Sequence, residues 1–387
     1  MNPIHISSEF DAGAIEVVSL ADPQDIQLNI RRDNASDFAQ WFYFCLHGAA
    51  NVPVRLSFLN AGQSAYPKGW EGYRVVCSTD HQNWARLDTE FDGQVMRVAL
   101  MPESNSVYLA YFEPFSHERH LDLIGSAASS EHVSLQRLGS TLDGRDMTLL
   151  RITHAQSATP LAQKKKIWLI ARQHPGETMA EWFVEGLLER LLDESDPVAR
   201  VLLDQCVFYV VPNLNPDGAV RGNLRTNAAG ANLNREWAAP SLEKSPEVYW
   251  VRQKMLEVGV DLSLDAHGDE GLPYNFVLGT EGTPGWGPRI QSLEEAFKTS
   301  WMAASPDFQT QHGYARGGRE EANMTLATNW IGQQFGCLAF TIEMPFKDNA
   351  DLPDRHVGWN GERSKRLGAS VLQPVLAVLA VLDRLRA

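Results

Sequence analysis

The sequence predicts two domains, an all-β sandwich over residues 1–115 and an α/β domain over residues 116–387 with a mixed, largely parallel central sheet flanked by helices. Two observations predict this division. Up to about residue 113, short strand-like runs are separated by Asn, Gly, Pro or Asp about every ten residues, which is typical of a sandwich or barrel. After Pro114, apolar runs alternate with longer helical segments, which is typical of a sheet covered by helices.

Several expected strands of the first domain alternate in polarity, as strands with one buried face do. The expected strands span residues 14–20, 41–48, 54–60, 73–80, 84–93, 94–100 and 107–112. Turn-forming residues separate them, so together they predict one β domain.

Apolar runs are the expected strands of the second domain, at residues 167–171, 207–211, 260–266 and 338–342. Between the first two runs, residues 181–194 place apolar side chains at the 3.6-residue period, which predicts an amphipathic helix against the sheet. The longest apolar stretch, residues 371–382, is too short to cross a bilayer and contains Pro374. We expect it to form a final helix packed on the core.

Composition and charge narrow the classes of function. The chain of 387 residues is 44% hydrophobic and 21% charged, which is typical of globular proteins rather than of disordered or membrane proteins. Its formal charge of -14 disfavours binding to nucleic acid or anionic lipid. The four cysteines lie far apart and the N-terminus lacks a secretory signal pattern, so we expect a cytoplasmic protein without nucleic-acid or membrane partners. The oligomeric state is left open.

Polar residues follow all four expected strands of the second domain. The strands lead, in order, into RQHPGE, PNLNPDG, HGDE and EMPF. Because the carboxyl ends of strands in an open α/β sheet face a common crevice, we expect side chains at these ends to converge. The residues concerned are His174, Glu177, His267 and Glu343.

His174 and Glu177 lie three residues apart at an expected helix start, where both side chains reach a single ion. Pro175 suits the first helical turn, because its missing N–H costs nothing there. His267 would complete two imidazoles and one carboxylate, the set that holds zinc in many hydrolases and leaves one position for water. The sequence thus predicts one Zn²⁺. The alternatives are a chance HxxE in a chain with 11 histidines and a histidine that merely belongs to a loop.

Two further groups point to the same place. Glu343 follows an apolar run, where a carboxylate is costly without a partner; the alternative is a buried glutamate paired with an arginine. Residues 215–237 contain Arg225, Asn234 and Arg235, and a guanidinium with a neighbouring amide is suited to hold a carboxylate. Taken alone, this Gly- and Asn-rich stretch would be assigned to a surface loop with solvated arginines.

Six motifs occur in the order in which the M14 metallocarboxypeptidases carry them: HPGE, NPDG, GNLR, NLNREW, DAHG and FTIEM. The chain therefore resembles this family, and most closely its cytosolic carboxypeptidase branch. The β domain adds to the likeness, since WFYFCL and YRVVCSTDHQNWARL resemble the N-terminal domain of that branch. The resemblance covers nearly the whole chain.

The resemblance implies catalytic roles for five residues. His174, Glu177 and His267 match the zinc ligands of the family. Glu343 matches the glutamate that acts as general base and acid, and Arg225 matches the arginine that stabilises the oxyanion.

The resemblance also implies how substrate is held. Asn234 and Arg235 match the pair that binds the terminal carboxylate, and Tyr314 matches a mobile aromatic residue over the bound end of the substrate.

Two positions depart from the family pattern. Gly176 replaces an arginine of the digestive enzymes, and Asn232 replaces an aspartate that usually bonds the first zinc histidine. A neutral amide at that place is expected to loosen or retune the metal.

The expected function is zinc-dependent hydrolysis of the C-terminal peptide bond of peptides or proteins. The resemblance extends to relatives that release glutamate, and Arg316 and Arg319 are candidate partners for an acidic side chain, the alternative being solvated loop arginines. Two other functions stay open: a zinc-dependent deacylase of small N-acyl amino acids, and a binding protein whose metal site is idle. A serine hydrolase is disfavoured, because the chain lacks a GxSxG motif.

Overall fold

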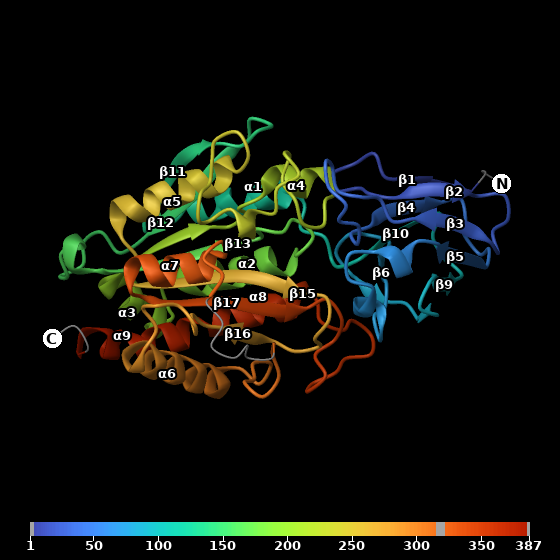
Figure 1. Ribbon diagram of the computed structural model, residues 1–387. Coiled ribbons are helices and arrows are strands. Elements are labelled where there is room, and N and C mark those ends of the chain that lie inside the picture. The colour runs from blue at the N-terminus through green and yellow to red at the C-terminus, as the bar shows by residue number, and fades with distance from the viewer. Residues whose placement is uncertain (1–3, 315–321, 385–387) are drawn as a thin grey trace.

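The computed structural model describes residues 4–314 and 322–384. The N-terminal strands gather at one end of the molecule, and a larger sheet with most of the helices forms the other end (Figure 1). This arrangement confirms the predicted fold class, a β sandwich followed by an α/β unit.

Two five-stranded sheets make up the N-terminal part. In spatial order, the first contains β1 (His5–Ser7), β4 (Tyr43–His47), β10 (Ser106–Ala110), β6 (Val76–Ser78) and β7 (Ala85–Arg86). The second contains β2 (Glu16–Ser19), β3 (Ile26–Asn29), β5 (Val54–Phe58), β9 (Met96–Leu100) and β8 (Thr89–Phe91). Phe44 of the first sheet packs on Phe58 of the second, with ring centroids 6.3 Å apart, so the sheets form a sandwich.

The sandwich differs from the expected strands in two respects. The sequence does not predict β1 or β3, because strands of three and four residues are too short to establish a period. Residues 84–93, expected as one strand, form two: β7 pairs with β6 in the first sheet, whereas β8 pairs with β9 in the second. Alternating polarity does not reveal that the chain changes sheets here.

A seven-stranded sheet is the centre of the C-terminal part. In spatial order it contains β11 (Val133–Ser140), β12 (Asp146–Ile152), β14 (Cys206–Val211), β13 (Lys165–Ala171), β15 (Leu262–Asp269), β17 (Leu338–Pro345) and β16 (Phe276–Leu278). The strands β14, β13, β15 and β17 pair in parallel, and the outer strands pair antiparallel. The four strands expected from the sequence correspond to this parallel set.

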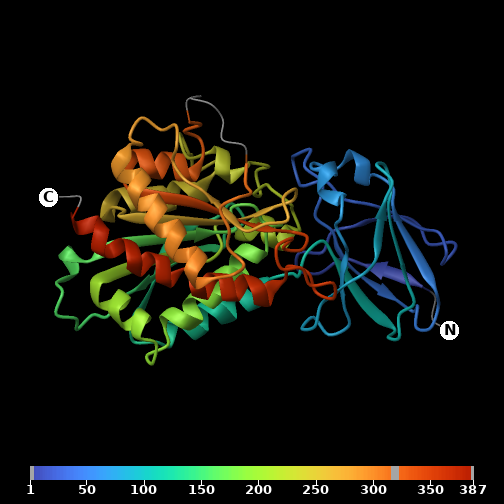
Figure 2. The same ribbon diagram turned by 90° about the horizontal axis from the view of Figure 1, so that it is seen from below.

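Helices cover both faces of the sheet. One face carries α5 (Pro246–Val258) and α7 (Ala327–Phe335); the other carries α2 (Met179–Leu191), α3 (Pro197–Gln205) and α6 (Pro288–Ala304), with α8 (Gly361–Ser370) packed on α2 and α9 (Leu372–Arg384) packed on α6. Figure 2, a view from below, shows α6, α8 and α9 in front of the sheet. Along β13, Trp168 joins the core beneath α5 and α7, and Leu169 joins the core on the other face.

Shorter elements connect these layers. They are α1 (His117–Ala128), α4 (Pro216–Arg221), η1 (Ala61–Gln63), η2 (Pro67–Trp70), η3 (Leu161–Gln163) and η4 (Leu233–Arg235), the last four being 3₁₀ helices. The expected C-terminal helix is α9, and Pro374 lies in its first turn. Within residues 4–314 and 322–384, none of the helices has the length and apolar character that a bilayer crossing requires.

The helix expected at residues 181–194 is α2, which begins two residues earlier and is buried on nearly all sides. Its outer face is covered by α8 at very short range. A Cβ atom on Gly186 would lie 1.9 Å from the Lys365 carbonyl oxygen, and one on Gly368 would lie 1.9 Å from the Phe183 carbonyl oxygen. These two glycines let the helix backbones touch, which fixes the position of α2 beneath the loop that precedes it.

Candidate active site

The loop between β13 and α2 carries His174 and Glu177. The expected helix start at these residues is wrong, because they form a turn in which the Glu177 N–H donates to the His174 carbonyl (3.1 Å), and α2 begins only at Met179. It begins at Arg172, whose φ of 57° lies in the left-handed region that most residues avoid. The buried Arg172 side chain donates from Nε to the Pro175 carbonyl (2.9 Å) and from Nη1 to Glu181 Oε2 (2.7 Å). The loop therefore owes its shape to a buried ion pair beneath it.

Strands β15 and β17 are neighbours and supply the other two expected residues near their carboxyl ends. His267 of β15 and Glu343 of β17 are Cα partners in the parallel register, and both are buried. In Figure 1 the arrowhead of β15 points toward the β sandwich. The candidate site thus lies where the sheet ends face the N-terminal part of the chain.

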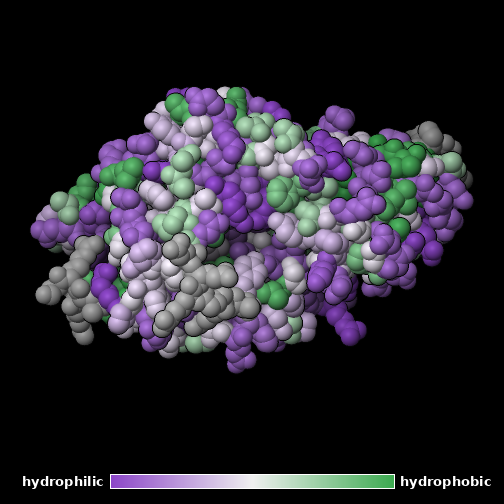
Figure 3. Space-filling model, viewed as in Figure 1, coloured by the Kyte–Doolittle hydropathy of each residue, from purple (hydrophilic) through white to green (hydrophobic). Residues whose placement is uncertain are grey.

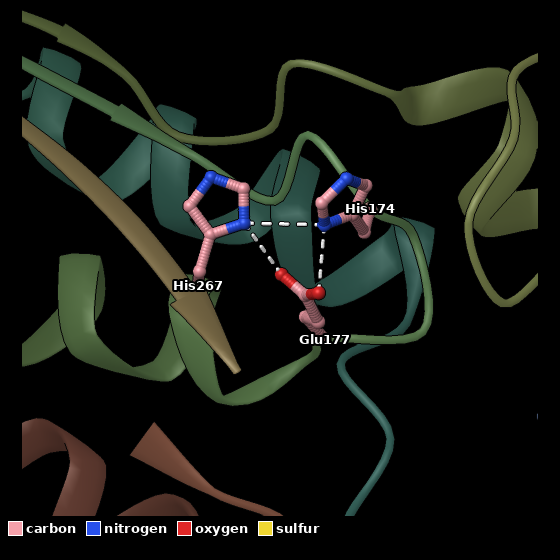
Figure 4. A group of neighbouring side chains, drawn as sticks. All are labelled: His174, Glu177 and His267. Atoms are coloured by element: carbon pink, nitrogen blue, oxygen red, sulfur yellow. Dashed lines mark hydrogen bonds and ion pairs between the residues drawn. The ribbon is translucent and has the colours of Figure 1, made fainter. Parts of the chain in front are cut away.

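His174, Glu177 and His267 form a compact, buried set of metal-ligating atoms (Figure 4). Glu177 Oε1 lies 2.7 Å from His174 Nδ1, and Glu177 Oε2 lies 2.8 Å from His267 Nδ1. The two Nδ1 atoms are 3.2 Å apart. Three residues from two separate segments of the chain thus aim their ligand atoms at one point.

The far nitrogens of the two imidazoles show that this set fits a cation. His174 Nε2 lies 3.0 Å from Asn232 Oδ1, and His267 Nε2 lies 3.0 Å from Asp265 Oδ2. Because both partners accept hydrogen bonds, the neutral form of each imidazole carries its proton on Nε2 and presents the lone pair of Nδ1. Two lone pairs and a carboxylate facing one another repel unless a cation lies between them. Zn–N bonds of about 2.0–2.1 Å in a tetrahedron separate two nitrogens by about 3.3 Å, close to the observed spacing.

The electrostatics of the loop favour the ligand forms of both residues. Burial, aided by the positive charge of Arg225, lowers the pKa of His174 to about 4, so its imidazole is neutral near pH 7. Burial alone would raise the pKa of Glu177, but this carboxyl group titrates at low pH, where His174 and His267 carry protons, and their positive charge holds its pKa below its ordinary value.

Glu343 is buried beside this set and is 7% exposed. Its Oε2 atom has no hydrogen-bond partner among the described residues. Burial, reinforced by the negative charge of Glu177, raises the pKa of Glu343 well above its ordinary value. An unpartnered carboxyl group with a raised pKa is able to exchange protons with a reactant in the same space.

Arg225 approaches from the loop that follows α4. Its Nη1 atom lies 3.8 Å from Glu177 Oε1. Its guanidinium carbon lies 5.3 Å from the centroid of the Tyr66 ring and 5.7 Å from that of Phe38. Both aromatic residues belong to the β sandwich, so the N-terminal part of the chain forms one wall around this arginine.

Asn234 and Arg235 lie on η4. Asn234 Oδ1 accepts a hydrogen bond from the Ala327 backbone N–H (2.9 Å), which fixes the amide and turns its NH₂ group away from α7. Arg235 Nη1 donates to the carbonyl of Asn234 (2.7 Å). Burial, together with the positive charge of Arg225, lowers the pKa of Arg235 from its ordinary value.

All eight residues expected from the sequence line one cavity of about 570 Å³: His174, Glu177, Arg225, Asn234, Arg235, His267, Tyr314 and Glu343. Residues 65–69 of the β sandwich complete its wall. Figure 3 shows a hollow near the middle of the face seen in Figure 1, within mostly hydrophilic surroundings. A cavity with several convergent polar groups beside a metal donor set is typical of an enzyme active site.

Family models match both parts of the chain. Residues 6–112 match the cytosolic carboxypeptidase N-terminal domain, and residues 120–357 match the zinc carboxypeptidase model. The chain belongs to the zinc carboxypeptidase family. The match confirms the predicted family and, with the His174, Glu177 and His267 set, the predicted zinc cofactor. The chain is a metallocarboxypeptidase.

Solved structures agree with this assignment over the whole chain. A metallo-carboxypeptidase from Burkholderia cenocepacia is 52% identical, with a TM-score of 0.95, and the match covers 98% of this chain and 100% of that one. A Pseudomonas aeruginosa metallo-carboxypeptidase in complex with (2-guanidinoethylmercapto)succinic acid is 47% identical, with a TM-score of 0.93, over 98% of this chain and 100% of that one. Human cytosolic carboxypeptidase 2 is 29% identical over 308 residues, which cover 72% of this chain but 34% of the human protein.

Tyr314 lies at the wall of the zinc carboxypeptidase cavity and is 46% exposed. Its hydroxyl donates a hydrogen bond to Asp269 Oδ2, and its ring packs edge-on against Phe276 with centroids 5.2 Å apart. Arg316 and Arg319, the candidate partners for an acidic side chain, lie outside the described residues.

Several residues of the site were not predicted from the sequence. Asp265, the acceptor for His267, had a signal in DAHG, since residues two apart in a strand lie on the same face. Glu270 lies two residues beyond this motif, at the end of HGDE; it is 6% exposed, lines the cavity, and burial raises its pKa to about 8. Tyr66 and Lys68 also line the cavity, but nothing in the sequence connects them with residues so far along the chain.

Proposed function

We propose that this metallocarboxypeptidase hydrolyses the C-terminal peptide bond of peptides or proteins with one Zn²⁺ held by His174, Glu177 and His267. The observation that carries the proposal is the convergence of these three side chains with Glu343 around one cavity. We also propose residues 1–115 and 116–387 as the two domains, and a cytoplasmic location, supported by the matches to cytosolic carboxypeptidases.

Zn²⁺ at this donor set supplies a Lewis acid that polarises the scissile carbonyl and makes water more acidic. Glu343 accepts the proton of the attacking water and delivers it to the leaving amine. Its burial supports this role, because a raised pKa makes the carboxylate a stronger base than an exposed glutamate. Its Oε2 atom, unpartnered among the described residues, is available to the reactant.

Arg225 stabilises the negative charge that develops on the carbonyl oxygen. Its guanidinium lies 3.8 Å from the ligand Glu177, between the metal donors and two aromatic rings. A positive charge fixed in advance where negative charge develops lowers the barrier without reorganisation.

Asn234 and Arg235 hold the free carboxylate of the substrate, which restricts cleavage to the chain end. Asn234 and Arg235 line the same cavity as the metal donors. Charge-assisted hydrogen bonds to a carboxylate are among the strongest in proteins. We assign Tyr314, which lines the same cavity, to contact with the terminal residue.

We propose terminal acidic residues, glutamate among them, as the preferred substrates. Arg235 and Lys68 supply positive charge to the cavity beyond Arg225, which supports this preference. Asp269 also lines the cavity and would repel an acidic side chain placed next to it, whereas the raised pKa of Glu270 keeps that carboxyl group largely protonated near pH 7. The succinic acid compound bound to the Pseudomonas enzyme carries two carboxylates and a guanidino group. Substrates with an acidic and with a basic terminal residue therefore both have to be tested.

The test is a panel of N-acetylated tripeptides that differ only in the last residue, with glutamate, lysine and phenylalanine compared on the zinc-loaded enzyme. We expect the highest kcat/KM for glutamate, and a loss of at least about 100-fold when the C-terminus of the best peptide is amidated, since a charge-assisted anchor is removed. Undiminished cleavage of the amide would refute the carboxylate anchor. Turnover of N-acyl amino acids but not of peptides would instead indicate a deacylase.

A further inference from the structure

We propose that Asp33 of the β sandwich is a positioning residue for Arg225, so that the N-terminal domain sets the geometry of oxyanion stabilisation in the other domain. The proposal rests on the proposed role of Arg225. It gives the β sandwich a function in catalysis rather than in assembly alone.

The Asp33 carboxylate holds three consecutive backbone amides of the Arg225 loop. Its Oδ1 atom accepts from the Leu224 N–H (2.6 Å), and its Oδ2 atom accepts from the N–H groups of Arg225 (2.8 Å) and Thr226 (3.0 Å). The Thr226 hydroxyl donates to the same Oδ2 atom (3.1 Å). One side chain thus accepts hydrogen bonds from four donors that belong to no helix or strand. The Asp33 carboxylate therefore holds this loop in place.

Asp33 is placed firmly enough to act as such an anchor. It is 5% exposed, and its own N–H donates to the carbonyl of Phe38 (2.8 Å), which closes a short turn. The next residue, Asn34, exchanges hydrogen bonds with Asn223 and donates from Nδ2 to the Ala228 carbonyl (2.9 Å). The turn and the Arg225 loop therefore dock along their length.

The β sandwich also holds the guanidinium end of Arg225. The rings of Phe38 and Tyr66 lie 5.7 and 5.3 Å from its central carbon, within the range of cation–π attraction. Phe38 belongs to the turn that begins at Asp33. The same turn therefore contacts both the backbone and the side chain of Arg225. Arginine is flexible, and an oxyanion group is effective only when it is ordered before the reaction.

The first experiment measures the loop directly, without turnover. Hydrogen–deuterium exchange of the full-length, zinc-loaded protein is compared for the wild type, Asp33→Ala and Asp33→Asn over residues 222–228. We expect faster exchange of the amides of Leu224, Arg225 and Thr226 in both variants, most in Asp33→Ala. Unchanged protection would overturn the proposal. Asp33→Asn keeps the size of the side chain and serves if Asp33→Ala folds poorly.

The second experiment asks whether the contact serves catalysis. We expect Asp33→Ala to lower kcat about 10- to 100-fold, less than the 10²–10³-fold typical of removing an oxyanion donor outright, with KM within about threefold and zinc content unchanged. In the Arg225→Ala background, Asp33→Ala should lower kcat less than about twofold further, because both changes act through one group. Asp37→Ala is the matched control, since Asp37 lies in the same turn but is exposed and pairs with Arg32.

The outcomes separate the two proposals. If Arg225→Ala retains wild-type kcat, the oxyanion role of Arg225 fails, and with it the catalytic purpose of Asp33. If Arg225→Ala is impaired but the Asp33 and Arg225 effects multiply, Asp33 acts elsewhere and only the positioning proposal falls. A lower Tm in Asp33→Ala with unchanged kcat would show an interdomain contact of structural value alone.

Discussion

The two zinc histidines have unlike hydrogen-bond acceptors, and this contrast predicts how the metal affinity is tuned. His267 Nε2 faces the Asp265 carboxylate and His174 Nε2 faces the Asn232 amide, both at 3.0 Å. A charged acceptor makes a stronger hydrogen bond and a more basic imidazole than a neutral one. We therefore expect Asn232→Asp to tighten zinc binding and Asp265→Asn to weaken it.

Burial sets the size of each effect. Groups that support metal ligands typically contribute 10- to 100-fold in affinity, or about 1.4–2.7 kcal/mol. Asp265 is 1% exposed and also accepts from Gln173 Nε2 (2.6 Å), so Asp265→Asn should lie near the 100-fold end. Asn232 is only partly buried, where solvent screens charge, so Asn232→Asp should give about 10-fold.

The assay is competition for Zn²⁺ between the apoprotein and a chromogenic chelator at fixed pH and ionic strength. Asn360→Asp is a matched control, because it adds the same charge at the N-cap of α8, where aspartate also caps a helix. We expect its zinc affinity to equal that of the wild type. If Asn232→Asp binds zinc no more tightly than the control while remaining folded, the charge of the acceptor does not govern the affinity of this site.

Three further predictions concern Glu343, the zinc ligands and Glu247. Glu343→Gln should lower kcat about 10²–10⁴-fold with zinc content unchanged by metal analysis, and wild-type turnover would exclude Glu343 as the base. Chelation of zinc should lower the Tm of the wild type but not that of His267→Ala. The reason is that a ligand at 1,000 times its Kd stabilises the folded state by about 4 kcal/mol. Equal Tm shifts in the two proteins would contradict the assignment of His267 as a ligand. Burial raises the pKa of Glu247 from 4.5 to about 7, so the folded chain holds a proton that the unfolded chain loses between these values. The stability from Glu247 is then complete below pH 4.5 and is lost as the pH rises toward 7. Denaturant unfolding of Glu247→Gln should show a shallower decline over this window, by up to about 1.4 kcal/mol per pH unit, and parallel curves would refute the shifted pKa.

Local patterns in the sequence determined part of the secondary structure and half of the site; strands such as β11, β12 and β16 were not predicted. Apolar runs of the right length predicted the parallel strands, and the 3.6-residue period predicted α2, because both depend on neighbours along the chain. The three-residue spacing of His174 and Glu177 predicted a pair of ligands for the same reason, although the two residues lie in a turn before α2 and not at a helix start. That His267 and Glu343 would join them followed from a general rule, since parallel strands end at a common edge.

Only the tertiary structure decided which residues from the β sandwich reach the site. Asp33 holds a loop 191 to 193 positions away along the chain, and Tyr66 packs on Arg225 from another part of the same domain. The division of residues 84–93 between two sheets was equally hidden. A period records which side of a strand is buried, but not what buries it. Contacts between domains depend on how two finished surfaces fit, and no stretch of sequence carries that information by itself.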